Sequence, residues 1–244
     1  MRVKAVVAYD GTGYGGFQKQ KNALSIQQDL ERVLSKLSGT PVSVLAAGRT
    51  DAGVHAEGQV IAFDMLWGHA LMDLQRAMNA ILPEQIAVLT VAEVPGEFHP
   101  RYDALSRWYR YTLFRGLARN PLFSRYSLHI SHPLRFDLMQ IAAQFLLGQH
   151  DFWAFGSPPK GNNSVREVYK ADWSEDGPWL YFDIVANAFL HRMVRMIVGT
   201  LLRVGSEALS PGEFSDILDS RDRRRAGPAI AARGLCLRRV IYEA

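Results

Sequence analysis

The pairing direction of two predicted strands most constrains the fold of this chain. Residues 165–173 and 179–187 both have strand-like patterns, and the turn residues Asp176, Gly177 and Pro178 lie between them. A connection this short cannot carry the chain across a sheet, so the two strands must run antiparallel. Other segments have helical periodicity. The sequence therefore predicts an α+β fold rather than a doubly wound parallel fold.

The predicted elements fall into two similar halves. In residues 1–103, strands are expected over 2–9, 42–47, 59–63 and 86–93, and helices over 25–37 and 71–82. In residues 104–244, strands are expected over 106–114, 165–173, 179–187 and 235–242, and helices over 138–147, 190–204 and a short segment opened by Ser210. We expect one largely antiparallel mixed sheet, with helices packed on it and a central RNA-binding cleft between the halves.

Several classes of protein do not fit the composition. With Cys236 as the single cysteine, the chain has no disulfide framework and no thiolate metal cluster, and a cytoplasmic location is expected. The seven histidines are scattered without ligand spacing, so no metal site is predicted. No apolar run approaches the length needed to span a membrane.

Residues 11–16, hereafter the glycine loop, match the spacing of a dinucleotide-binding loop. A dinucleotide site needs a helix that opens at the third glycine and an acid at the end of the next strand. Here residues 17–22 intervene, and Asp29 and Glu31 lie inside an amphipathic helix. A tight glycine-rich turn is the favoured interpretation, and nucleotide binding stays as an alternative that NAD or ATP titration tests.

Residues 47–56, hereafter the Asp51 loop, place small residues around one acid, one arginine and one histidine. Arg49 lies two positions from Asp51, and a nearby guanidinium favours the ionised carboxylate. An ionised carboxylate can serve as a nucleophile or a base. Taken alone, the loop favours a salt bridge or a turn-capping aspartate. A structural hydrogen-bonding role is favoured for His55.

Arginines interleave with aromatic residues over 101–125. Arginine supplies 22 of the 28 basic residues in the chain, and only Asp103 opposes the six arginines of this segment. Alternation in the strand puts Trp108 and Arg110 on one face and Tyr109 and Tyr111 on the other. This pattern suits unstacked RNA bases and phosphates, although an edge strand with arginines in solvent is the alternative.

A fourth segment, residues 187–200, is expected to begin a helix with Arg192 and Arg195 one turn apart. Taken together and in order, residues 9–20, 48–56, 107–111 and 187–199 resemble the TruA family of tRNA pseudouridine synthases. The resemblance spans nearly the whole chain. It departs from the common pattern at Phe17, Trp108 and Met196.

The resemblance implies roles for four residues. Asp51 corresponds to the catalytic aspartate, and Tyr109 to the tyrosine that packs against the target base. Arg195 matches the basic partner of the aspartate. Arg49 matches the arginine that enters the RNA helix to displace the target uridine, a step that is needed because the reacting atoms are inaccessible in a stacked stem.

The implied activity is isomerisation of uridine to pseudouridine at positions 38, 39 and 40 of the tRNA anticodon stem-loop. Nothing is oxidised and no group is added, so no cofactor is needed. The resemblance also implies a homodimer in which one tRNA contacts both subunits. The alternative from another class is a non-catalytic RNA-binding protein that uses the arginine-aromatic strand. The sequence leaves open the chemical path at Asp51 and the role of residues 221–225.

Overall fold

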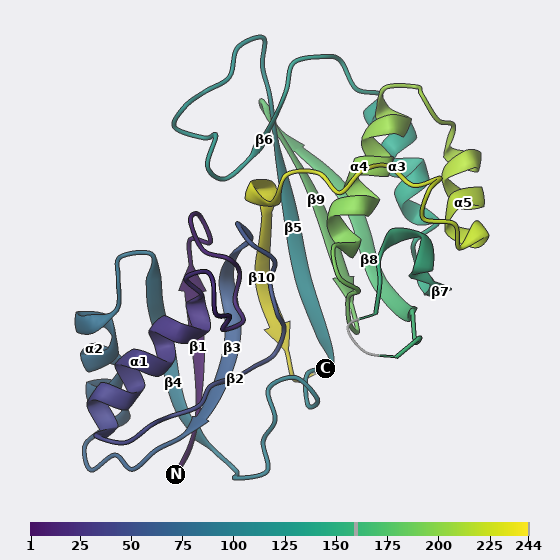
Figure 1. Ribbon diagram of the computed structural model, residues 1–244. Helices are drawn as coiled ribbons and strands as arrows, with labels where there is room; N and C mark the ends of the chain where they lie inside the picture. The colour runs from purple at the N-terminus through teal and green to yellow at the C-terminus, as the bar shows by residue number, and fades with distance from the viewer. Residues whose placement is uncertain (159–160, 244) are drawn as a thin grey trace. The chain divides into compact units, whose positions relative to one another are not determined.

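The computed structural model describes residues 1–158 and 161–243. Packing divides the chain into two compact units: Met1–Leu105 together with the segment from Cys236 onward, and Ser106–Leu235. Each unit combines strands and helices, and most of the strand pairs are antiparallel (Figure 1). The predicted α+β class is therefore confirmed.

In the first unit, β1 (Arg2–Tyr9) lies between β3 (His55–Asp64) and β4 (Ile86–Val94) and runs antiparallel to both. β2 (Leu45–Ala46) pairs with β3 on its other side. β10 (Leu235–Ile241) is parallel to β3, with Cys236 opposite His55. Two helices, α1 (Ile26–Ser38) and α2 (Leu71–Ile81), lie side by side against these strands (Figure 1).

In the second unit, the strand order is β5 (Ser106–Arg115), β9 (Trp179–Ala186), β8 (Val165–Asp176) and β7 (Gly148–Asp151), all antiparallel to their neighbours. β6 (Leu128–Ile130) pairs with β5 in parallel. The helices α3 (Phe136–Gln144), α4 (Met193–Gly205) and α5 (Pro211–Ser220) pack on one another. Two 3-10 turns, η1 (Phe152–Phe155) and η2 (Ala232–Gly234), complete the unit.

Local chemistry explains where the best-predicted elements begin and end. The side chain of Ser25 accepts a hydrogen bond from the Gln28 amide, which caps α1, and Gly39 ends the helix with φ of 71°. Ser210 and Glu213 form a reciprocal capping box at the start of α5. Alternate residues of β1 are buried, as a strand with one covered face requires.

The structure differs from the sequence expectation in several places. The packing places β10 with the first unit because it pairs with β3, whereas the predicted halves were residues 1–103 and 104–244. β2 is only two residues long, and β6 and β7 were not predicted. Helix α4 begins at Met193 instead of residue 190, because Arg192 has a left-handed φ of 63°. None of the helices in the described ranges is long and apolar enough to span a membrane.

Candidate active site

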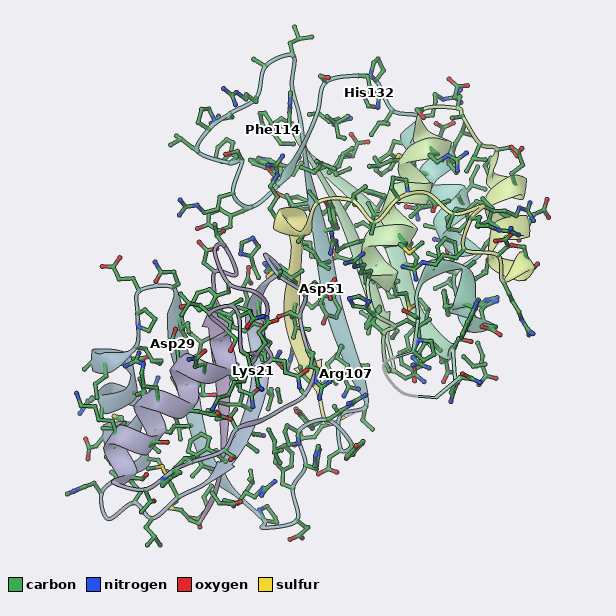
Figure 2. All side chains as sticks on the ribbon, viewed as in Figure 1. Lys21, Asp29, Asp51, Arg107, Phe114 and His132 are labelled. Carbon is green, nitrogen blue, oxygen red and sulfur yellow. The ribbon has the colours of Figure 1, made fainter. Side chains whose placement is uncertain are left out.

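The Asp51 loop joins β2 to β3, and its last two residues begin β3. The amide of Val54 donates to the Asp51 carbonyl oxygen at 3.1 Å, which closes a β-turn, and Gly53 has φ of 75° as the third residue of a type II turn requires. Asp51 is half-buried and Arg49 is exposed. Figure 2 shows Asp51 where β1 ends and β3 begins. The turn thus presents an acid and an arginine from one loop.

The glycine loop packs against the backbone of the Asp51 loop. The Phe17 amide donates to the Thr50 carbonyl oxygen at 3.1 Å. A Cβ on Gly11 would overlap the Val54 carbonyl group, so only glycine fits there. The Tyr14 amide closes a turn onto the Gly11 carbonyl oxygen, and α1 does not begin until Ile26. The expected tight turn is confirmed, and its glycines allow close approach to the Asp51 loop.

Buried hydrogen bonds hold the Asp51 loop from beneath. The Tyr9 hydroxyl lies 2.8 Å from Thr50 Oγ1. Gln59 Nε2 donates to the Tyr9 hydroxyl oxygen at 3.3 Å and to the Gly48 carbonyl oxygen at 2.9 Å. Burial raises the pKa of the Tyr9 phenol above its usual range, so Tyr9 stays neutral. The sequence reasoning missed both Tyr9 and Gln59, because each also fits an ordinary strand position.

His55 is a buried, hydrogen-bonded residue, in agreement with its predicted structural role. Its Nδ1 atom lies 3.1 Å from the Gly11 amide nitrogen and 3.1 Å from Asp10 Oδ1. The Gly11 amide donates to His55 Nδ1. The Thr12 amide donates to Asp10 Oδ1 at 2.9 Å in the same turn. His55 therefore fastens the start of the glycine loop to the end of the Asp51 loop.

Tyr109 lies in the second unit, on the buried face of β5. Its ring meets Phe189 edge to face, with ring centroids 5.0 Å apart and an interplanar angle of 80°. Such a contact fixes the plane of the tyrosine ring. The predicted alternation along β5 is confirmed, since Tyr109 and Tyr111 are buried while Trp108 and Arg110 are half-exposed.

Arg195 lies on α4 and is half-buried. Its Nε donates to the Ile230 carbonyl oxygen at 2.7 Å, which anchors the stem of the side chain to the segment that follows α5. Burial raises the pKa of the Tyr111 phenol above its usual range, while Arg195 and Arg233 act in the opposite direction. The Tyr111 hydroxyl donates to the Ala231 carbonyl oxygen at 2.7 Å.

Part of the arginine-aromatic strand serves the fold. Asp183 accepts two hydrogen bonds from Arg110, at 2.9 and 2.7 Å, and one from Trp108 Nε1 at 2.7 Å. Arg107 is buried and donates to the Asn187 carbonyl oxygen at 2.6 Å. The interpretation of an edge strand with solvent-exposed arginines is therefore wrong for Arg107. Arg101, Arg119 and Arg125 are exposed.

The described residues hold no group of three or more histidine, cysteine or acidic side chains arranged to bind a metal ion. The residues predicted for the site divide between the two units. Arg49 and Asp51 belong to the first unit, and Tyr109 and Arg195 to the second. Chemically, the first unit offers a carboxylate and an exposed guanidinium on one loop whose backbone is held, and the second offers a fixed aromatic ring and an anchored cation.

Comparison with known proteins gives a consistent result. A family model described as tRNA pseudouridine synthase matches residues 5–103 and 142–243, which include Asp51 and Arg195. The tRNA pseudouridine synthase A of Moorella thermoacetica is 43% identical over 248 residues, covering 98% of this chain and 99% of that protein. The protein of the same name from Syntrophotalea carbinolica is 42% identical, covering 98% of this chain and 96% of that protein. The one from Streptococcus thermophilus is 41% identical, covering 100% of both chains.

Proposed function

The chain belongs to the tRNA pseudouridine synthase family of isomerases, and we propose that it converts uridines 38, 39 and 40 of the tRNA anticodon stem-loop to pseudouridine with Asp51 as the catalytic carboxylate. The observation that carries the role of Asp51 is its place in a turn whose backbone is held while its side chain stays accessible. Preorganised catalytic groups of this kind lose little freedom when the substrate binds.

The reaction breaks the bond between N1 of uracil and C1′ of ribose and forms a bond between C5 and C1′. C5 loses a proton and N1 gains one, so the product is an isomer of the substrate and no electron is gained or lost overall. An ionised Asp51 is suited to attack C1′, to add to C6 of the ring, or to remove a sugar proton. All three routes use a carboxylate and no cofactor.

Three further residues complete the proposal. Tyr109, whose ring is fixed by Phe189, would stack on the detached uracil and keep it oriented for the second bond. Arg195 would keep the Asp51 carboxylate charged in a site from which RNA excludes water. Arg49, exposed in the Asp51 loop, would enter the RNA stem as the target uridine leaves it.

The partners in this proposal are tRNA and a second copy of the chain. The basic charge, +4 overall, favours RNA binding. Exposed apolar side chains within residues 117–126 support association with another protein surface; they are Leu117, Leu122, Phe123 and Tyr126. A tRNA-modifying role places the protein in the cytoplasm. Mass determination in solution, with and without tRNA, tests the homodimer.

The proposed activity is tested by tritium release from unmodified tRNA that carries uridine labelled at C5. We expect release with the intact protein and none with Asp51→Asn, while both bind tRNA. Asp73→Asn, which changes an exposed acid on α2, is the matched control and should keep wild-type turnover. Binding without release by the intact protein, on tRNA with uridine at 38, 39 or 40, would favour the non-catalytic RNA-binding alternative.

A further inference from the structure

We propose that Tyr9 and Gln59 are positioning residues, which hold the Asp51 carboxylate in its productive place by fixing Thr50 and Gly48. The inference rests on the proposed catalytic role of Asp51. Neither residue faces solvent: Tyr9 is 4% exposed and Gln59 is fully buried. They therefore act on the reaction through the loop and not by contact with RNA.

The Gly48 carbonyl oxygen fixes the orientation of the Gln59 side chain. This oxygen can only accept, so the Gln59 group that faces it must be the amide nitrogen Nε2. The same nitrogen donates to the Tyr9 hydroxyl oxygen. The Tyr9 hydroxyl also shares a hydrogen bond of 2.8 Å with Thr50 Oγ1, in which either oxygen can be the donor. The network therefore connects Gln59 to Thr50 through Tyr9.

The network clamps the loop immediately before the catalytic residue. Gln59 holds the Gly48 carbonyl group and Tyr9 holds the Thr50 side chain, on either side of the exposed Arg49. The Thr50 carbonyl oxygen accepts from the Phe17 amide at 3.1 Å. Thr50 is thus fixed through both its backbone and its side chain, and the next residue in the chain is Asp51. Rotation of this peptide would move the carboxylate.

Because the network is buried, water cannot replace a hydrogen-bond partner that is removed from it. Thr50 is 6% exposed, and Gln59 Oε1 has no hydrogen-bond partner among the residues that the structure describes. An unpartnered buried oxygen is a cost to stability, which two donated hydrogen bonds from the same amide offset. Removing the Tyr9 oxygen would therefore release the loop.

Tyr9→Phe is the first test, because it removes one oxygen and keeps the ring. A displacement of about 1 Å at a catalytic group lowers a rate by about 100-fold, so we expect kcat to fall by about tenfold or more. The KM for tRNA should stay unchanged. Thr50→Val should reproduce the effect, and Thr50→Ser, which keeps the hydroxyl, should retain activity. The double variant Tyr9→Phe with Thr50→Val should be no slower than the worse single variant.

Tyr242→Phe is the matched control. Its hydroxyl donates to the Pro100 carbonyl oxygen at 2.7 Å, and Tyr242 follows the end of β10 opposite to the pair formed by Cys236 and His55. The Tyr242→Phe variant removes one tyrosine oxygen from the same unit as Tyr9→Phe does, and it should leave kcat unchanged. Thermal unfolding of each variant shows whether it is folded. If Tyr9→Phe does not fold, the kcat and KM of Thr50→Val and Thr50→Ser test the positioning role in its place.

The outcomes separate this inference from the proposed function. Wild-type kcat in folded Tyr9→Phe and Thr50→Val would overturn the positioning role, as would an effect confined to KM. Those results would not affect the proposed catalytic role of Asp51. Turnover by Asp51→Asn would instead overturn the proposed function, whatever Tyr9→Phe does.

Discussion

Gly16 packs directly on Asp51: a Cβ added to Gly16 would lie 3.2 Å from the Asp51 carbonyl carbon and 2.8 Å from the Thr50 carbonyl oxygen. Gly16 also has φ of 108°, which side chains rarely tolerate. Two independent constraints therefore restrict this position to glycine: its own backbone conformation and its contact with the Asp51 loop.

Gly16→Ala should lower both stability and turnover, because relief of the contact must move the backbone of Thr50 or Asp51. Gly13→Ala is the control, since Gly13 has a positive φ of 81° but open space around its Cα. Gly13→Ala should cost only about 1–2 kcal/mol from its backbone conformation and keep turnover. Urea unfolding and tritium release measure the two effects. Equal turnover in both variants would contradict the role assigned to the contact.

Gly199 lies on α4, the helix that carries Arg195, and a side chain at this position should be tolerated as poorly as one at Gly16. Its Cβ would overlap the Pro228 carbonyl oxygen, and the nearby Gly227 amide donates to Thr200 Oγ1 at 2.8 Å. We expect Gly199→Ala to lower the melting temperature and turnover together. Gly212→Ala on α5 meets nothing closer than 3.9 Å and should be neutral or stabilising. An unchanged melting temperature and turnover in Gly199→Ala would show that residues 227–228 can move away from α4 at little cost.

Arg49→Ala should weaken tRNA binding without unfolding the protein. Arg49 is exposed, so the expected change in the free energy of unfolding is within about 0.5 kcal/mol. If Arg49 contacts a phosphate or enters the stem, the slope of log affinity against log salt should fall by about one. Arg32→Ala, at an exposed arginine that pairs with Asp29, is the control. An unchanged slope in Arg49→Ala would remove Arg49 from the RNA interface.

Arg110→Met should destabilise the second unit and leave the salt slope of tRNA binding unchanged. Asp183 is buried, and it would lose both bonds from Arg110. Because Arg110 is half-exposed and Asp183 keeps its bond from Trp108, the cost should be less than the roughly 3–5 kcal/mol of a fully buried pair. Arg135→Met removes an exposed pair with Asp137 and should change stability much less, because solvent screens an exposed ion pair. A lower slope in Arg110→Met, measured by titration at several salt concentrations, would assign Arg110 to RNA binding.

The raised pKa of Tyr9 gives a prediction for alkaline pH. The phenol titrates at a higher pH in the folded chain than in the unfolded chain, where its pKa is about 10. Its contribution to stability is therefore fully present below about pH 10 and is lost as the pH rises towards the folded value. Tyr9→Phe should flatten this alkaline loss.

Between about pH 6 and 9, the ratio of wild-type to Tyr9→Phe turnover should be constant, since Tyr9 stays neutral. A ratio that changes in this range would mean that another group titrates in the network.

Elements governed by local rules were predictable from the sequence. The hairpin of β8 and β9 followed from its short turn, and α1 and α5 followed from their apolar stripes and caps. The Asp51 loop stood out because an acid, an arginine and a histidine lie among small residues. These signals reside within about ten consecutive residues, so no knowledge of the tertiary structure is needed to read them.

Features that depend on distant contacts could not be predicted in this way. Nothing local shows that β10 pairs with β3, because parallel partners far apart in sequence have no connecting turn. Arg192 carries a left-handed backbone although the sequence around it favours a helix. The sequence predicts Tyr9 only as the last residue of a strand and the first of the motif over residues 9–20, because the fold brings its hydroxyl partner Thr50 to it.

The placement of β10 also has a consequence for synthesis on the ribosome. Residues 106–235 form one uninterrupted unit, so all of its residues have emerged before β10 is complete. The first unit, although it is translated earlier, lacks a strand until residues 235–241 appear, and that strand pairs at His55 and Ala56, at the end of the Asp51 loop. The nascent protein therefore completes its N-terminal unit last, and a chain that stops before β10 lacks the strand that pairs at the end of the Asp51 loop.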